Sequence, residues 1–243
     1  MDNSLEMSFF RVNKWLLGLI GFWPLDKFNR AKKIKIFFNL ILLITAIFGE
    51  FRFAVLMRKD PLYAFEVILP CLTKIVTWIK LICFVVYRRD LELILKRLFE
   101  HCKTDTKNIE KNKLIARVTY ITNIWCKVLY INAVSLLSLF AVKPLLIWVY
   151  QFLMSGNKDN WVDLPFPAAL PYEDMTRINN KTLYSIIYCF LVHSGTINIL
   201  GVCGTDGTFL CFCLYISVSY QCLQEDFKRS FKSFRLGGKF AGN

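Results

Sequence analysis

Long apolar stretches dominate the pattern of the chain and predict membrane-spanning helices. A helix needs about 20 mostly apolar residues to cross roughly 30 Å of hydrocarbon. Four stretches meet this requirement, at about 36–57, 66–87, 128–154 and 183–202. The sequence therefore predicts an all-α fold, a polytopic membrane helical bundle with about four transmembrane helices.

The fourth apolar stretch continues beyond the length of one span. Apolar residues run through 183–223, with a glycine-rich interruption at 201–207. A second crossing after the interruption would place the basic tail, 224–243, on the same side as the loop at 155–182, which charge asymmetry disfavours. We expect instead that a helical extension leaves the bilayer and continues to residue 223.

Basic residues are distributed unevenly between the two sides of a four-span bundle. The segments on one side hold 22 Lys and Arg, and the two loops on the other side hold 5. Because cytoplasmic loops accumulate Lys and Arg, the N-terminus is expected in the cytoplasm. The chain then divides into a cytoplasmic or interfacial segment (1–35), the transmembrane bundle with its extension (36–223) and a basic cytoplasmic tail (224–243). Within the first part, the short apolar stretch 15–23 is expected to lie on or dip into the membrane surface.

Composition supports a membrane protein and argues against nucleic-acid binding. Hydrophobic residues make up 55% of the 243 residues, aromatic residues 16%, and the mean hydropathy is +0.41, which is too apolar for an ordinary soluble domain. A net charge of +13 is typical of some nucleic-acid-binding proteins, but no nucleic-acid-binding motif is present. Basic cytoplasmic loops explain the charge without a nucleic-acid partner.

The sequence offers little for catalysis, metal binding or a cofactor. Its nine cysteines contain no Cys-x-x-Cys pair, and there are only two histidines, so a Cys/His zinc site is not expected. None of the common nucleophile, metalloprotease or phosphate-loop motifs is present. We therefore expect a protein that is not an enzyme and that needs no cofactor.

Single charges within the apolar stretches need partners. An unpaired charge in the membrane costs about 2.5–3.5 kcal/mol or more. Glu50 and Lys74 lie about 10–12 Å from the same ends of the first two spans, so we expect a structural ion pair between them. Lys80 is close enough to the end of its span to reach the surface with its own side chain. Lys143 lies mid-span, and the sequence names no partner for it.

The segment between the second and third spans, 88–127, has the pattern of an amphipathic helix. Apolar residues recur at helical spacing while Arg, Lys and Glu fill the opposite face. Two interpretations remain open: a solvated helix that projects below the membrane, or a packed cytoplasmic bundle with the extension of the fourth helix.

The loop at 155–182 is expected to form an extended cover on the outer side. Three prolines within seven residues, Pro165, Pro167 and Pro171, fix the backbone and disfavour a helix. The loop also contains Asn180-Lys-Thr182, the chain's one glycosylation sequon, so Asn180 is a glycosylation candidate.

Polar and aromatic residues recur every three or four positions in the outer halves of the last three spans. Ordinary helix packing explains such a stripe, and so does a largely apolar ligand pocket with a few hydroxyl groups. The candidate ligand-binding residues are Thr73, Thr77, Pro144, Trp148, Tyr184, Tyr188 and Leu191.

Four motifs, taken in order, resemble the insect odorant receptors. They are Asn13-Lys-Trp-Leu-Leu-Gly-Leu-Ile-Gly-Phe-Trp-Pro24, Asp163-Leu-Pro-Phe-Pro with Pro171-Tyr-Glu, Gly204-Thr-Asp-Gly-Thr-Phe209 and Tyr220-Gln-Cys-Leu223. The third is similar to the family's Asp-Thr-x-Phe segment, with a glycine inserted.

The resemblance implies a function and a set of partners. Members of the family have seven spans and form odorant-gated cation channels, as tetramers with a shared co-receptor, in the plasma membrane of sensory-neuron dendrites. It implies that a volatile, mostly apolar odorant binds in the outer half of the bundle. Compared with such receptors, this chain is expected to be a truncated product or a partial sequence. The alternative is a truncated, non-conducting membrane subunit or adaptor that modulates a full-length channel.

Overall fold

The computed structural model describes residues 10–105, 109–155, 164–166, 168 and 181–240. These residues form helices and, within the described ranges, no strand. The helices are α2 (Arg11–Ile20), α3 (Arg30–Leu56), α4 (Pro61–Val86), α5 (Arg88–Asp105), α6 (Ile109–Ser155) and α7 (Lys181–Phe240). The prediction of an all-α fold is therefore confirmed.

Among the described residues, four helices are long and apolar enough to cross a membrane, in agreement with the four predicted spans. The candidate spans are Arg30–Leu56 in α3, Val67–Val86 in α4, Lys111–Pro144 in α6 and Thr182–Lys228 in α7. The main difference concerns α6, which begins at Ile109 rather than near residue 128. Polar and apolar residues alternate at helical spacing across that boundary, so hydropathy alone places the start of the helix too late.

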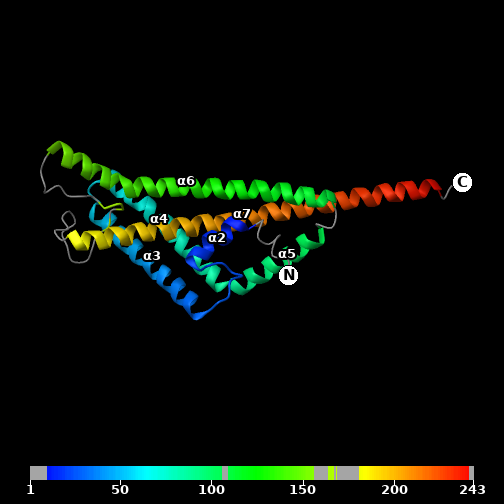
Figure 1. The fold of residues 1–243 in the computed structure, drawn as a ribbon, viewed down its shortest axis with the longest axis horizontal. Helices are drawn as coiled ribbons and strands as arrows, with labels where there is room; N and C mark the ends of the chain where they lie inside the picture. Colours follow the sequence, from blue (N-terminus) through cyan, green and yellow to red (C-terminus); the bar gives the residue numbers. More distant parts are fainter. Residues whose placement is uncertain (1–9, 106–108, 156–163, 167, 169–180, 241–243) are drawn as a thin grey trace.

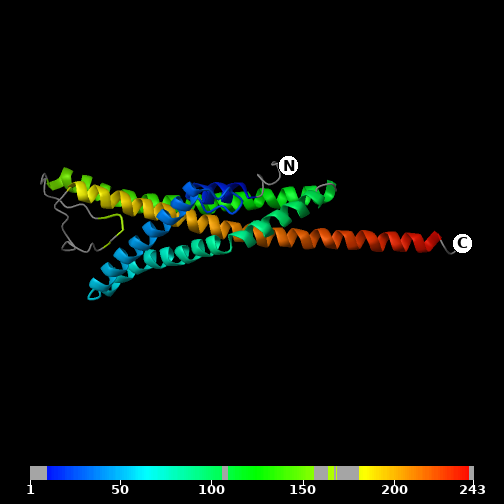
Figure 2. The same cartoon turned by 90° about the horizontal axis from the view of Figure 1, so that it is seen from below.

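The two longest helices, α6 and α7, lie side by side and define the long axis of the molecule (Figures 1 and 2). Helix α7 runs without a break through residues 201–207, so the fourth apolar stretch and the segment after it form one continuous helix. Its 60 residues correspond to about 90 Å at 1.5 Å per residue. The C-terminal part of α7 extends beyond the other helices (Figure 2).

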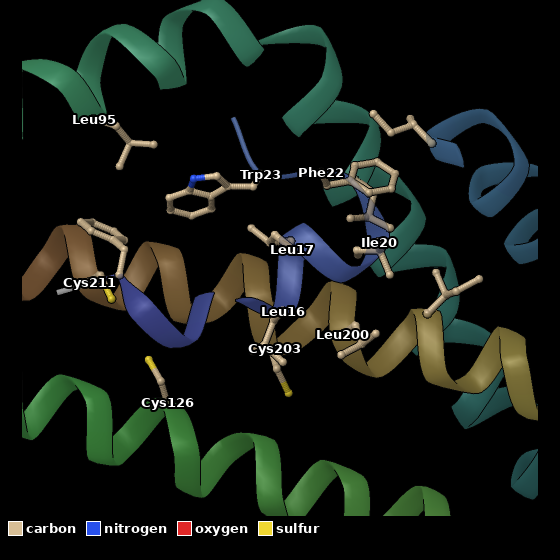
Figure 3. Packing of buried hydrophobic residues seen from close by; sticks show 14 of the residues in the cluster. Leu16, Leu17, Ile20, Phe22, Trp23, Leu95, Cys126, Leu200, Cys203 and Cys211 are labelled. Carbon is tan, nitrogen blue, oxygen red and sulfur yellow. The ribbon is translucent and has the colours of Figure 1, made fainter. Parts of the chain in front are cut away.

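Two glycines in α7, Gly204 and Gly207, allow α2 to pack closely against this helix. A side-chain carbon at Gly204 would lie 2.6 Å from Leu17 Cγ, and one at Gly207 would lie 2.3 Å from Asn13 Oδ1. Leu16 and Leu17 are fully buried against α7 (Figure 3). The short segment expected at the membrane surface thus packs its apolar face against the bundle.

A central cluster joins α2 to α5 and α7. The Phe10 ring lies 5.7 Å from the Phe99 ring of α5 and 5.7 Å from the Phe212 ring of α7, between ring centroids. Leu95 and Leu98 of α5 are buried in the same cluster. The structure therefore favours the packed alternative for the amphipathic segment that begins at residue 88.

A second contact holds the start of α6 against the extension of α7. Ile115 packs against Val218 and Cys222, and Lys111 Nζ lies 2.7 Å from Asp226 Oδ2. These contacts involve the first turns of α6 and a part of α7 more than 35 residues from its start, so the two helices remain paired over most of the length of α6.

Arg88 fixes the connection between α2 and α3 to the start of α5. Its guanidinium donates to the carbonyl oxygens of Trp23 and Asp26, at 3.1 and 2.6 Å, and lies 4.5 Å from the centre of the Phe28 ring. Burial lowers the pKa of Arg88, and the charge of Asp26 opposes that shift. The arginine remains charged at physiological pH because its ordinary pKa is far above 7.

Candidate ligand-binding site

The antiparallel pair α3 and α4 carries a buried ion pair. Glu50 continues the buried stripe of α3, which also contains Ala46 and Phe53, and Lys74 lies between the buried residues Cys71 and Thr77 of α4. Lys74 Nζ donates to Glu50 Oε1, and the two side chains are 1% and 0% exposed. The structure thus brings together the two charges that the sequence placed at a similar depth.

One oxygen of this ion pair has no hydrogen-bond partner. Glu50 Oε2 is buried and, among the described residues, receives no hydrogen bond. The neighbouring thiol of Cys71 donates to the Ile47 carbonyl oxygen at 3.7 Å instead. A buried carboxylate oxygen without a donor is unusual, because burial removes the water that would otherwise satisfy it.

The aromatic ring of Phe166 covers the ion pair. Lys74 Nζ lies 4.3 Å from the centre of that ring, within the range of a cation–π interaction. Phe166 belongs to the proline-rich loop, yet its side chain is only 5% exposed. Its ring stacks on Phe140 of α6, with 5.4 Å between ring centroids. A loop residue therefore fills a place enclosed by α4, α6 and α7.

A glycine in α7 gives the Phe166 ring its place. A side-chain carbon at Gly195 would lie 3.0 Å from Phe166 Cε2 and 2.8 Å from Leu137 Cδ1. Any larger residue at this position would compete with the ring. The ring also belongs to an apolar group that we call the Phe166 cluster, with the buried members Phe166, Ile187 and Leu191 and the partly buried members Leu137, Leu164, Ala168, Leu183 and Phe190.

Four candidate residues from the stripe with described side chains lie on α6 and α7, the two helices that contribute to the Phe166 cluster. Leu191 is a member of it. The Tyr184 and Tyr188 rings lie 5.9 Å apart on α7, and the Tyr188 hydroxyl donates to the Ala141 carbonyl oxygen of α6. Pro144 is buried in α6. Because proline has no amide hydrogen, Pro144 cannot donate the usual helical hydrogen bond to the Phe140 carbonyl oxygen. The hydrogen bond from the Tyr188 hydroxyl to Ala141 forms in the same turn of α6.

The two threonines of the stripe form a separate polar contact between α4 and α7. Thr77 Oγ1 lies 2.7 Å from the Thr73 carbonyl oxygen and 2.6 Å from Asn198 Oδ1. Thr73 is exposed and donates from Oγ1 to the Pro70 carbonyl oxygen at 2.8 Å. A side-chain carbon at Gly201 would lie 2.6 Å from Thr77 Cγ2, so the absence of a side chain at Gly201 lets α4 and α7 approach each other here.

Two candidates cannot be placed by the structure: Trp148, predicted to bind the ligand, and Asn180, predicted as a glycosylation site. The side chain of Trp148 and the whole of Asn180 lie outside the described residues. Conversely, Phe166, Gly195 and Asn198 contribute to the site but had no role in the sequence-based prediction. Phe166 lies between Pro165 and Pro167, which restrict the backbone but do not indicate where the ring points.

Lys80 departs from the sequence-based expectation. Instead of reaching the membrane surface alone, its Nζ lies 2.5 Å from Asp206 Oδ1 of α7. The side chains of this pair are 36% and 48% exposed, unlike those of Glu50 and Lys74. The partner could not be identified from the span ends, because Asp206 becomes a neighbour only through the register between α4 and α7.

The arrangement has the composition of a small-molecule binding site. It offers apolar and aromatic walls, a buried ion pair and a few hydroxyl groups, the mixture typical of small-molecule sites. Among the described residues, no group of three or more His, Cys, Asp and Glu could hold a metal ion.

Comparison with known proteins identifies relatives of this chain. Residues 60–233, well over half of the chain, match a family model described as 7tm Odorant receptor. Similar curated proteins from Drosophila melanogaster include Odorant receptor 24a (26% identical, 91% of this chain and 54% of the relative) and Odorant receptor 10a (23% identical, 96% and 57%). The chain spans about half the length of the curated relatives it matches.

Proposed function

The chain belongs to the 7tm odorant receptor family, and from this premise we propose that it binds volatile, mostly apolar odorants in the membrane, between α4, α6 and α7. The observation that carries the proposal is the family match itself. Residues 60–233 include every wall of the site on those three helices and the loop residue Phe166. The apolar lining with a few hydroxyl groups supports an odorant as ligand.

The proposal extends to the complete receptor. There, this part of the protein couples odorant binding to the opening of a cation channel, formed as a hetero-oligomer, a tetramer, with a shared co-receptor. The location is the plasma membrane of olfactory sensory neurons, including the dendrite. The four apolar helices and the receptor relatives support the membrane setting.

Tyr188 provides the test of the binding site. Replacing it with Phe removes the hydrogen bond to the Ala141 carbonyl oxygen and keeps the ring. We expect the affinities of a panel of odorants to change unequally, by about fivefold for those that contact this turn, since a neutral hydrogen bond contributes about 1 kcal/mol.

The measurement is ligand-detected NMR on the purified chain in lipid nanodiscs. Tyr220→Phe is the matched control, because Tyr220 lies on the same helix but is 67% exposed and far from the Phe166 cluster. If both variants bind the odorants with the same rank order and dissociation constants as the native chain, Tyr188 contributes only to helix packing.

Co-expression separates the receptor from the adaptor alternative. A receptor chain expressed with a full-length co-receptor confers a current whose odorant preference changes in Tyr188→Phe. An adaptor changes the size of the co-receptor current, and the Tyr188 substitution leaves odorant preference unaltered.

We also expect an N-inside, four-span topology, from the excess of basic residues on one side. Lys59 lies in the exposed turn between α3 and α4, and Lys96 is exposed on α5. A single added cysteine at Lys59 should react with a membrane-impermeant maleimide applied to intact cells, and one at Lys96 only after permeabilisation. Reaction of both from the same side would contradict the topology.

A further inference from the structure

We propose that the free carboxylate oxygen of Glu50 is the hydrogen-bond acceptor for a neutral alcohol, which binds in the place that the Phe166 ring occupies. The inference deepens the proposed function and rests on it, because the alcohol is taken as a class of odorant. It assigns the polar end of the site to an ion pair on α3 and α4 and the apolar end to the Phe166 cluster.

The first argument is the unsatisfied acceptor. Lys74 donates to Glu50 Oε1, while Oε2 is buried and without a donor among the described residues. Glu50 is 0% exposed, so bulk water does not compensate. A ligand that brings one hydrogen-bond donor would satisfy the oxygen without disturbing the ion pair.

The second argument is the position of Phe166. The neighbours of the Phe166 ring include three residues on helices: Lys74 on α4, Phe140 on α6 and Gly195 on α7. The Phe166 ring comes from the loop and lies directly over Lys74, against the bare backbone of Gly195. A benzene ring has about the size of a small volatile molecule. Phe166 therefore occupies the space that an apolar ligand body would need, and it competes with that ligand.

The third argument is charge, which selects the ligand class. Glu50 and Lys74 together are neutral, so a cationic amine or a carboxylate would add an uncompensated charge to a buried site. Ethers and esters carry no hydrogen for Glu50 Oε2. An alcohol is neutral, donates once, and its oxygen can accept from the ammonium of Lys74. The site thus favours alcohols over the other classes.

Two isomers of equal composition test the donor directly. 1-Hexanol and methyl pentyl ether share one molecular formula, but only hexanol donates a hydrogen bond. In lipid nanodiscs, the native chain should bind hexanol about tenfold more tightly than the ether, since hydrogen bonds to charged groups are the stronger kind. Ligand-detected NMR measures both dissociation constants.

Paired substitutions show whether the ion pair carries this preference. Glu50→Met together with Lys74→Met removes both charges and keeps unbranched side chains, and it should bring the two isomers to equal affinity. Lys80→Met together with Asp206→Met is the matched control, because it removes a different ion pair of α4, the one with α7, and the preference for hexanol should persist. Phe166→Ala should tighten the binding of both isomers several-fold, since it removes the competing ring.

Infrared spectroscopy on the unchanged chain adds a readout that does not depend on the folding of any variant. Hexanol should shift a carboxylate stretching band, and the ether should not. The proposal is overturned if the native chain binds the isomers equally, if the preference survives loss of Glu50 and Lys74, or if hexanol shifts no carboxylate band. In each of these cases odorant binding still stands when limonene, which has no donor, binds. Failure of hexanol, the ether and limonene to bind would overturn both proposals.

Discussion

Gly207→Ala is expected to lower the free energy of unfolding by about 2–3 kcal/mol, the upper part of the range for overpacking a tight interior contact. The new methyl group would lie 2.3 Å from Asn13 Oδ1 and 3.3 Å from Cys126 Sγ. Asn13 is 1% exposed and donates from Nδ2 to Cys211 Sγ at 3.0 Å, so it cannot move without losing that bond. We therefore expect α2 to separate from α7 at this point.

Gly18→Ala is the matched control for this prediction. Gly18 is also helical, but nothing lies within 4 Å of the position that its side chain would take. Alanine is favoured over glycine in a helix by about 1 kcal/mol, so this variant should be slightly more stable than the native chain. Thermal unfolding of the detergent-purified protein, followed by circular dichroism, compares the two. Similar shifts in the same direction would mean that α2 does not dock at Gly207.

The α3 and α4 helices show why the spans could be predicted. A membrane span depends on length and hydropathy, two properties that are local to the sequence. The same locality placed Glu50 and Lys74 at matching depths, because residues in two helices joined by a short turn can be counted from that turn. The pairing of neighbouring spans is therefore accessible from the amino-acid sequence alone.

Contacts that depend on the register between helices far apart in the sequence could not be predicted from the sequence. Lys80 pairs with Asp206 because α4 and α7 pack against each other at Thr77 and Gly201. The number of residues between each charge and the end of its span does not predict this contact. The glycines at 201–207 gave the impression of an interruption, whereas α7 is continuous there: Gly204 and Gly207 allow α2 to approach, and Gly201 allows α4 to approach. Loop residues have no periodicity to guide an assignment, so the return of Phe166 into the bundle was not predicted.

Removal of either charge of the buried pair is expected to be the most destabilising change in the bundle. In Glu50→Met the ammonium of Lys74 stays buried without a counter-ion, and in Lys74→Met the carboxylate does. Breaking a buried pair in this way costs about 3–5 kcal/mol. The double variant leaves two apolar side chains among Ala46, Phe53 and Cys71, and it should lose far less than either single variant.

The coupling between the two substitutions distinguishes this pair from a surface pair. Lys96 and Glu92 on α5 are 56% and 38% exposed and four residues apart, and such helix pairs contribute only about 0.3–0.5 kcal/mol. A double-mutant cycle at Lys96 and Glu92 should therefore show almost no coupling, whereas the cycle at Glu50 and Lys74 should show several kcal/mol. Unfolding by denaturing detergent measures both cycles. Additive losses at Glu50 and Lys74 would show that each charge is compensated by something other than its partner, and the free oxygen of Glu50 would then have to be satisfied from another source.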